Sequence, residues 1–171
     1  IVFDGNNWVI DEVKKAHFIV ASSGTITISN NVNSPNVITT FSLQSAYNFT
    51  LRTSDGAMQN TSGRDIGGIS GNIAMQINNI GGGTKTLYFW SEISSNGITF
   101  TPIANSLRVR EVASSNESFL STVSFTNTWP DQYWIRFVFY STGGMEFYSP
   151  NITSDGDSID GRSMVWELTE Q

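Results

Sequence analysis

Residues 133–140 (YWIRFVFY) carry the clearest structural pattern in the chain, a regular alternation with a period of two. Successive side chains of a β-strand point to opposite faces of the sheet. One face of this segment therefore collects Tyr133, Ile135, Phe137 and Phe139. The length and aromatic content predict a central strand that is covered on at least one face.

A second pattern predicts a β-hairpin. Residues 87–93 (LYFWSEI) and 98–103 (ITFTPI) have the composition of strands, and the sequence SSNG separates them. The pair Asn96 and Gly97 readily adopts the positive φ angles that tight hairpin turns need. We therefore expect the two segments to pair as neighbours.

Short strands also account for most of the remaining chain. Further segments with strand character are 16–20, 25–29, 37–43, 47–53, 72–78, 107–112, 119–125, 145–148 and 163–168. Residues 55–70 and 79–84 are rich in glycine and lack alternation, so we expect long surface loops there. Only residues 9–16 (VIDEVKKA) have helical spacing, enough for about two turns.

This many short strands predict an all-β fold of two packed antiparallel sheets, a jelly roll or β-sandwich. A chain of 171 residues fits one domain. Because the sequence starts at Ile1 without methionine, we expect a processed product or a domain of a longer protein, with residues 1–171 as a single domain in its C-terminal part; a trimmed start would give the same sequence.

Composition excludes several classes of function. The formal net charge is −6, which is the wrong sign for binding a phosphate backbone, so nucleic acid is not an expected partner. No apolar run is long enough to cross a bilayer. Cysteine is absent, so thiolate chemistry and cysteine metal clusters are excluded. Ser, Thr and Asn make up about a third of the chain, a neutral polar surface that is typical of extracellular and virion surface proteins.

The sequence also offers little for catalysis. His17 is the single histidine, and its apolar neighbours indicate an ordinary strand position rather than a member of a catalytic triad. A pair of carboxylates could hydrolyse glycosides, and Glu92 with Glu111 or Glu167 is the pair to test. Each of these acids is isolated, at a strand position that faces away from apolar neighbours, so we expect no enzyme, with a glycoside hydrolase as the third hypothesis.

The most acidic stretch, residues 155–161 (DGDSIDG), has two interpretations. The carboxylates of Asp155, Asp157 and Asp160 are hard oxygen donors of the kind that Ca²⁺ binds. Ile159 stands where an EF-hand loop places a further oxygen ligand, which favours a solvated loop over a metal site. We expect no cofactor, and Ca²⁺ is the one alternative.

Aromatic residues beside loops are the candidates for ligand binding. Trp8 and Trp129 lie next to turn sequences, so we expect them to be exposed, together with Asp131 and Asn151 on loops. Exposed tryptophan with amide and carboxylate groups is suited to recognising a sugar. The other tryptophans lie within strong strand segments, which favours packing: Trp90, Trp134 and Trp166.

Three segments carry a family resemblance: residues 86–112, residues 133–150, and, after the acidic loop, a short closing strand in residues 162–171 (RSMVWELTEQ). In strand order and aromatic content, about residues 85–171 resemble the C-terminal half of the C1q/TNF-like jelly rolls found at the tips of bacteriophage fibres and in related virion proteins. The resemblance implies a homotrimeric head whose outer loops contact a bacterial surface receptor. It implies no catalytic residues. The stalk that usually precedes such a head has no counterpart here, since the chain contains neither Gly-x-y repeats nor heptads.

The leading hypothesis is therefore a phage or viral structural domain that acts in assembly or host-receptor binding. Its partners would be copies of itself, other virion proteins, or a bacterial surface receptor or glycan, and its location the virion surface or another extracellular setting. The alternative is a monomeric carbohydrate-binding module or lectin-like domain of a secreted bacterial protein.

Overall fold

The structure is a computed structural model, and it describes residues 2–3, 8–9, 15–20, 25–28, 30–31, 33, 35–37, 41–46, 49–52, 54–80, 82–113, 117–125, 128–148 and 165–170. Within these residues it contains strands and no helix. The strands are β1 (Val2–Phe3), β2 (Trp8–Val9), β3 (Lys15–Val20), β4 (Thr25–Ile28), β5 (Asn36–Val37), β6 (Phe41–Ala46), β7 (Phe49–Arg52), β8 (Ala57–Asn60), β9 (Ile69–Asn79), β10 (Lys85–Ser94), β11 (Thr101–Pro102), β12 (Arg108–Val112), β13 (Glu117–Phe125), β14 (Trp134–Ser141), β15 (Met145–Tyr148) and β16 (Val165–Glu170).

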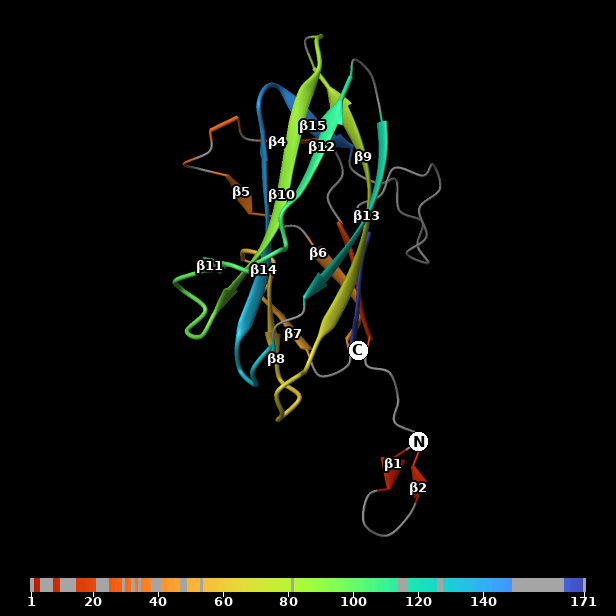
Figure 1. Cartoon of the computed structure of the whole chain (residues 1–171), viewed down its shortest axis with the longest axis vertical. Helices are drawn as coiled ribbons and strands as arrows, with labels where there is room; N and C mark the ends of the chain where they lie inside the picture. Colours follow the sequence, from red (N-terminus) through yellow and green to blue (C-terminus); the bar gives the residue numbers. More distant parts are fainter. Residues whose placement is uncertain are drawn as a thin grey trace.

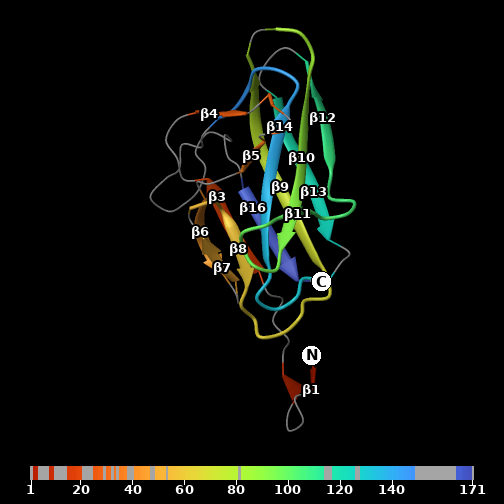
Figure 2. The same ribbon diagram turned by 90° about the vertical axis from the view of Figure 1, so that its left-hand side faces the viewer.

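Apart from a small hairpin of β1 and β2, the strands form two antiparallel sheets that lie face to face along the long axis (Figure 1). One of them, called the β10 sheet, has the strand order β11-β10-β14-β8-β7. In this sheet β12 also pairs with β10, and β5 pairs with β14. The other, the β9 sheet, has the order β4-β15-β9-β16-β3-β6, with β13 also paired to β9. Figure 2 looks onto the β10 sheet, with β12 along one edge and β7 near the other.

The chain passes repeatedly from one sheet to the other. It leaves the β10 sheet after β8, returns with β10, leaves again for β13, and returns once more with β14 before it ends in the β9 sheet. Strands that are consecutive in sequence are therefore often in opposite sheets. This arrangement is a two-sheet jelly roll, and it confirms the all-β fold expected from the sequence.

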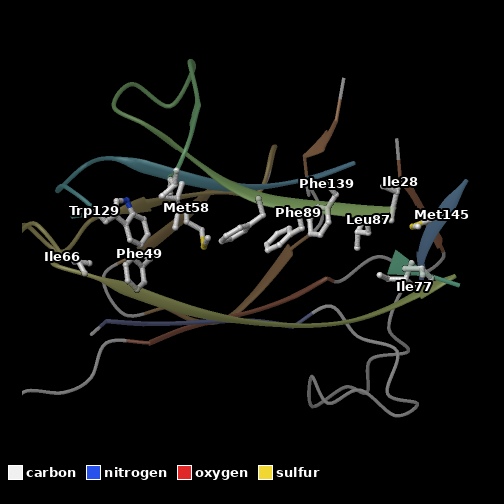
Figure 3. Close-up of a cluster of buried hydrophobic side chains, with 14 residues drawn as sticks. Ile28, Phe49, Met58, Ile66, Ile77, Leu87, Phe89, Trp129, Phe139 and Met145 are labelled. Atoms are coloured by element: carbon white, nitrogen blue, oxygen red, sulfur yellow. The ribbon is translucent and has the colours of Figure 1, made fainter. Parts of the chain in front are cut away.

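The core fills the space between the two sheets (Figure 3). Phe89 of β10 lies with its ring centre 4.7 Å from that of Phe139 and 6.1 Å from that of Phe137, both of β14. Each of these side chains is at most 1% exposed, and burying a large apolar side chain stabilises a fold by about 1.5–3 kcal/mol. From the other sheet, Ile28, Ile77 and Met145 join the same cluster. The alternation predicted for residues 133–140 is confirmed.

The predicted hairpin is confirmed in its pairing and corrected in its turn. Ile93 of β10 lies opposite Thr101 of β11, so the connection is wider than the tight turn expected. Gly97 has a φ of 70°, as predicted, but Asn96 is outside the left-handed region. The reason is that Asn96 uses its side chain rather than its backbone to make the turn, as described below.

Two expectations about local structure were wrong. The first is the predicted helix at residues 9–16, whose described ends belong to β2 and β3, while residues 10–14 lie outside the described residues. Because β3 pairs with β6 and β16, sheet pairing overrides the helical spacing at this end. The predicted loop at residues 55–70 contains β8 and the start of β9. β8 has only four residues, and its pairing with β7 and β14 comes from tertiary structure rather than from an apolar pattern.

The core assignment predicts a large difference between two substitutions. Phe89→Ala empties the centre of the cluster and should lower the free energy of unfolding by about 3–5 kcal/mol. Ile98→Ala, at a side chain that is 82% exposed, should change it by less than about 0.5 kcal/mol. Urea unfolding followed by fluorescence measures both values. Equal losses in the two variants would contradict the assignment of Phe89 to the core.

Candidate binding surface at the β10–β11 loop

Two short side chains organise the β10–β11 loop, defined here as residues 95–100. The hydroxyl oxygen of Ser94 accepts the N–H of Gly97 at 2.9 Å. The side-chain oxygen of Asn96 accepts the N–H groups of Ile98 at 2.8 Å and of Thr99 at 2.9 Å. The hydroxyl of Ser94 also donates to that same oxygen at 3.0 Å, which links the two centres. The loop backbone is thereby fixed by its own residues, in the manner of an Asx turn.

An arginine on β7, the strand at the opposite edge of the β10 sheet, holds the loop against the outer face of that sheet. Arg52, at the end of β7, donates from Nη2 to the carbonyl oxygen of Gly97 at 2.7 Å. Its guanidinium centre lies 4.5 Å from the ring centre of Trp134. A methyl group at position 97 would meet Arg52 Nη1 at 2.9 Å and Trp134 Nε1 at 3.0 Å, so only glycine allows this approach.

Asp55 fixes the position of that arginine. Its carboxylate accepts from Arg52 Nε at 2.8 Å and from Nη2 at 2.5 Å, a bidentate pair in which both side chains are partly exposed. Burial alone would raise the pKa of Asp55. The hydrogen bonds from Arg52 and from the backbone N–H of Ala57, with the charges of Arg52 and Arg136, lower that pKa by more, so the net shift is downward.

A second ion pair lies on the outer face of the same sheet. Arg136 of β14 donates from Nε to Oε2 of Glu92 at 2.8 Å, and the two residues are directly opposite in the β10–β14 register. The indole N–H of Trp90 donates to the other oxygen of Glu92 at 3.1 Å. The guanidinium of Arg136 lies 4.0 Å from the ring centre of Phe100, so the end of the loop also rests on this pair.

The loop presents one apolar side chain to solvent. Ile98 is 82% exposed, although the backbone that carries it is fixed on both sides. Next to the loop is an open hollow of about 300 Å³. Hydroxyl and amide groups lie beside apolar surface in its lining, which is made of Ile93, Ser94, Ser95, Asn96, Thr99, Thr101 and Tyr133. The surface therefore combines one apolar protrusion with an uncharged recess whose lining is part polar and part apolar.

Among the residues predicted to bind a ligand, Trp129 is placed differently from the expectation. Its side chain is 3% exposed and stacks on Phe49 with ring centres 5.0 Å apart, while its indole N–H donates to the carbonyl oxygen of Tyr133 at 3.0 Å. The expectation that it is exposed was wrong, because the loop beside it folds inward through a bridge between residues 66 and 129. Trp129 belongs to the core.

Asp131 is partly buried and helps to hold two loops together. Its carboxylate accepts the backbone N–H of Gly63 at 3.0 Å, and its backbone N–H donates to a carboxylate oxygen of Asp65 at 2.9 Å.

Of the other predicted site residues, only Trp8 is among those that the structure describes. Trp8 lies in β2, opposite Phe3 in the backbone register. Asn151 and the acidic residues Asp155, Asp157 and Asp160 lie outside the described residues. Within the described part of the chain, no group of three or more His, Cys, Asp or Glu side chains could hold a metal ion.

Two of the three tryptophans expected in packing lie outside the core. Trp90 and Trp134 are half-buried on the outer face of the β10 sheet, where each contacts one of the two ion pairs, rather than between the sheets. The Arg52–Asp55 pair and the exposure of Ile98 were not predicted from the sequence. The local pattern Ser-x-Asn-Gly could have indicated a side-chain turn. Nothing in the sequence connects Arg52 with Gly97, which lies 45 residues later.

The lowered pKa of Asp55 predicts a pH-dependent contribution to stability. A carboxyl whose pKa is lower in the folded state stabilises the fold above its unfolded pKa of about 3.9, and this contribution is lost as the pH falls through the folded value. Asp55→Asn should therefore cost about 1 kcal/mol at neutral pH, and the difference should shrink below about pH 4. Urea unfolding of both proteins between pH 2 and 7 measures it. A difference that stays constant to pH 2 would contradict the pairing.

Comparisons with known proteins support the fold alone. No family model and no curated protein matches the chain. Within the described residues, no helix has the length and apolar character needed to cross a membrane. One similar solved structure is that of Eiger TNF from S. frugiperda, with a TM-score of 0.59, 11% sequence identity, and coverage of 93% of this chain and 92% of that chain. The chain therefore has a two-sheet jelly-roll fold similar to that of a TNF-family protein.

Proposed function

We propose that this chain is a non-catalytic binding domain on the surface of a bacteriophage or viral particle, where it acts in assembly or host-receptor binding. The observation that carries the proposal is the β10–β11 loop, whose backbone is fixed by Ser94, Asn96 and Arg52 while Ile98 remains 82% exposed. A rigid loop with an exposed apolar side chain is suited to contact with a partner, since little conformational entropy is lost on binding. The assignment to a virion follows from the resemblance to fibre-tip jelly rolls.

The surroundings of the candidate catalytic acids support a role without catalysis. Both carboxylate oxygens of Glu92 already accept hydrogen bonds, from Arg136 and from Trp90. Glu111 lies opposite Thr86, which is six positions from Glu92 along β10, or about 20 Å at roughly 3.3 Å per residue. Paired glycosidase carboxylates are about 5–10 Å apart. Glu167 belongs to β16 of the other sheet, whereas Glu92 faces outward.

We further propose that the domain is a homotrimer, as the resemblance to C1q/TNF-like heads implies. Support comes from β12, which pairs only with β10 among the described strands and so leaves one edge open. This edge strand carries Val109 at 55% exposure, and Leu107 just before it is 53% exposed. The strand also carries Arg108, Arg110 and Glu111, so the apolar exposure is confined to these two side chains, which a neighbouring chain could cover. A neighbouring copy that covers this edge accounts for the exposure, in keeping with a particle surface or other extracellular location.

A monomeric carbohydrate-binding module is the second candidate. The observation that favours it is the open hollow of about 300 Å³ beside the loop, where hydroxyl groups and the ring of Tyr133 come together. Hydroxyl groups and one aromatic ring are the usual elements of sugar recognition. In this candidate the hollow, rather than Ile98, is the contact surface.

The mass in solution separates the two candidates. The leading proposal predicts about 56 kDa, three times the 18.8 kDa of one chain, by light scattering at micromolar concentration. Val109→Asp should shift this mass towards that of the monomer, because a charge would then be buried at the covered edge. Thr50→Asp, at an exposed position on β7, is the control and should leave the mass unchanged. A wild-type mass of one chain would contradict the trimer and favour the sugar-binding candidate.

A further inference from the structure

We infer that the β10–β11 loop is the receptor contact of this domain, and that Ile98 is an anchor which a protein on the bacterial surface buries in an apolar pocket. The inference rests on the proposed function and adds to it the contact residue and the chemical class of the receptor. Its basis is the combination of a fixed backbone, an exposed aliphatic tip and the absence of charge in the loop sequence SNGITF.

Exposure of a single isoleucine carries little information, because isolated apolar side chains are common on protein surfaces. The distinguishing feature is the structure that holds it. The N–H of Ile98 and the N–H of Thr99 both bond to Asn96, and Arg52 bonds to the carbonyl oxygen of Gly97 just before Ile98. Fixing the loop lowers the entropy cost of presenting the side chain to a partner.

The chemistry of the tip favours a protein over a glycan. An aliphatic side chain has no ring face for stacking on a sugar. The side-chain oxygen of Asn96 is also occupied, because it accepts bonds from Ile98, Thr99 and Ser94. Apolar pockets that could bury an isoleucine are a feature of protein surfaces. A protein receptor therefore fits this tip better than a polysaccharide.

The surroundings of Ile98 have the composition of an interface centre. Arg52 and Trp134 are half-buried beneath the loop, and Phe100 closes its end above Arg136. Tryptophan and arginine are enriched among the residues that dominate binding energy at interfaces. The guanidinium groups of Arg52 and Arg136 are already paired with carboxylates. When a partner covers the loop, each arginine would therefore lose water together with its carboxylate rather than as an unpaired charge.

The experiment uses the full chain fused to a fluorescent protein and titrated onto a panel of bacterial strains, with bound fluorescence read by flow cytometry. Ile98→Ser should weaken binding about tenfold or more, because burying an aliphatic side chain of this size is worth at least one tenfold step in affinity. Ile98→Val should retain most of the binding. Ile80→Ser, at a residue 41% exposed in another loop, is the matched control and should change binding less than about twofold. Equal melting temperatures establish that all variants are folded.

Treatment of the cells identifies the class of receptor. Protease treatment should abolish binding, while periodate oxidation of surface glycans should leave it intact. Binding that survives Ile98→Ser, or that periodate removes and protease does not, would overturn the inference and leave the proposed receptor-binding function standing. No binding to any strain would count against receptor binding itself, and the inference would fail with it.

Discussion

The antiparallel register between β10 and β14 determines both faces of the β10 sheet. It runs over eight residue pairs and sets Phe89 opposite Phe139 on the side that faces the core. The same register sets Glu92 opposite Arg136 on the side that faces solvent. Because side chains alternate along a strand, a shift by one residue would exchange the two faces and expose the aromatic core. Core packing therefore also fixes the polar network outside.

The outer network connects this register to the β10–β11 loop. Arg136 supports Phe100 at the end of the loop, while Arg52 bonds to Gly97 near its middle. Each arginine has a carboxylate partner and an aromatic ring, an arrangement that restricts long side chains which would otherwise move freely. The loop is therefore attached to a sheet whose own position is set by the core. Packing energy in the interior thus supports the geometry of one exposed side chain, Ile98.

Much of the fold could be predicted from sequence, because alternating apolar residues report directly on strands with one buried face. Residues 133–140 and the β10–β11 pairing are examples. The short strand β8 and the buried position of Trp129 could not be predicted, since both depend on pairing with distant segments. The candidate surface was missed for the same reason. Arg52, Gly97 and Trp134 come together only in the folded sheet, and an arginine in a strand gives no local indication of its partner.

The central claim is that the β10–β11 loop is held in one conformation before any partner binds. Amide hydrogen exchange followed by NMR tests it at single residues in the isolated protein. The N–H groups of Gly97, Ile98 and Thr99 should exchange at least about tenfold more slowly than in an unstructured peptide, and Asn96→Ala should remove the protection at Ile98 and Thr99. Exchange of these amides at the unstructured rate in the unsubstituted protein would contradict the account.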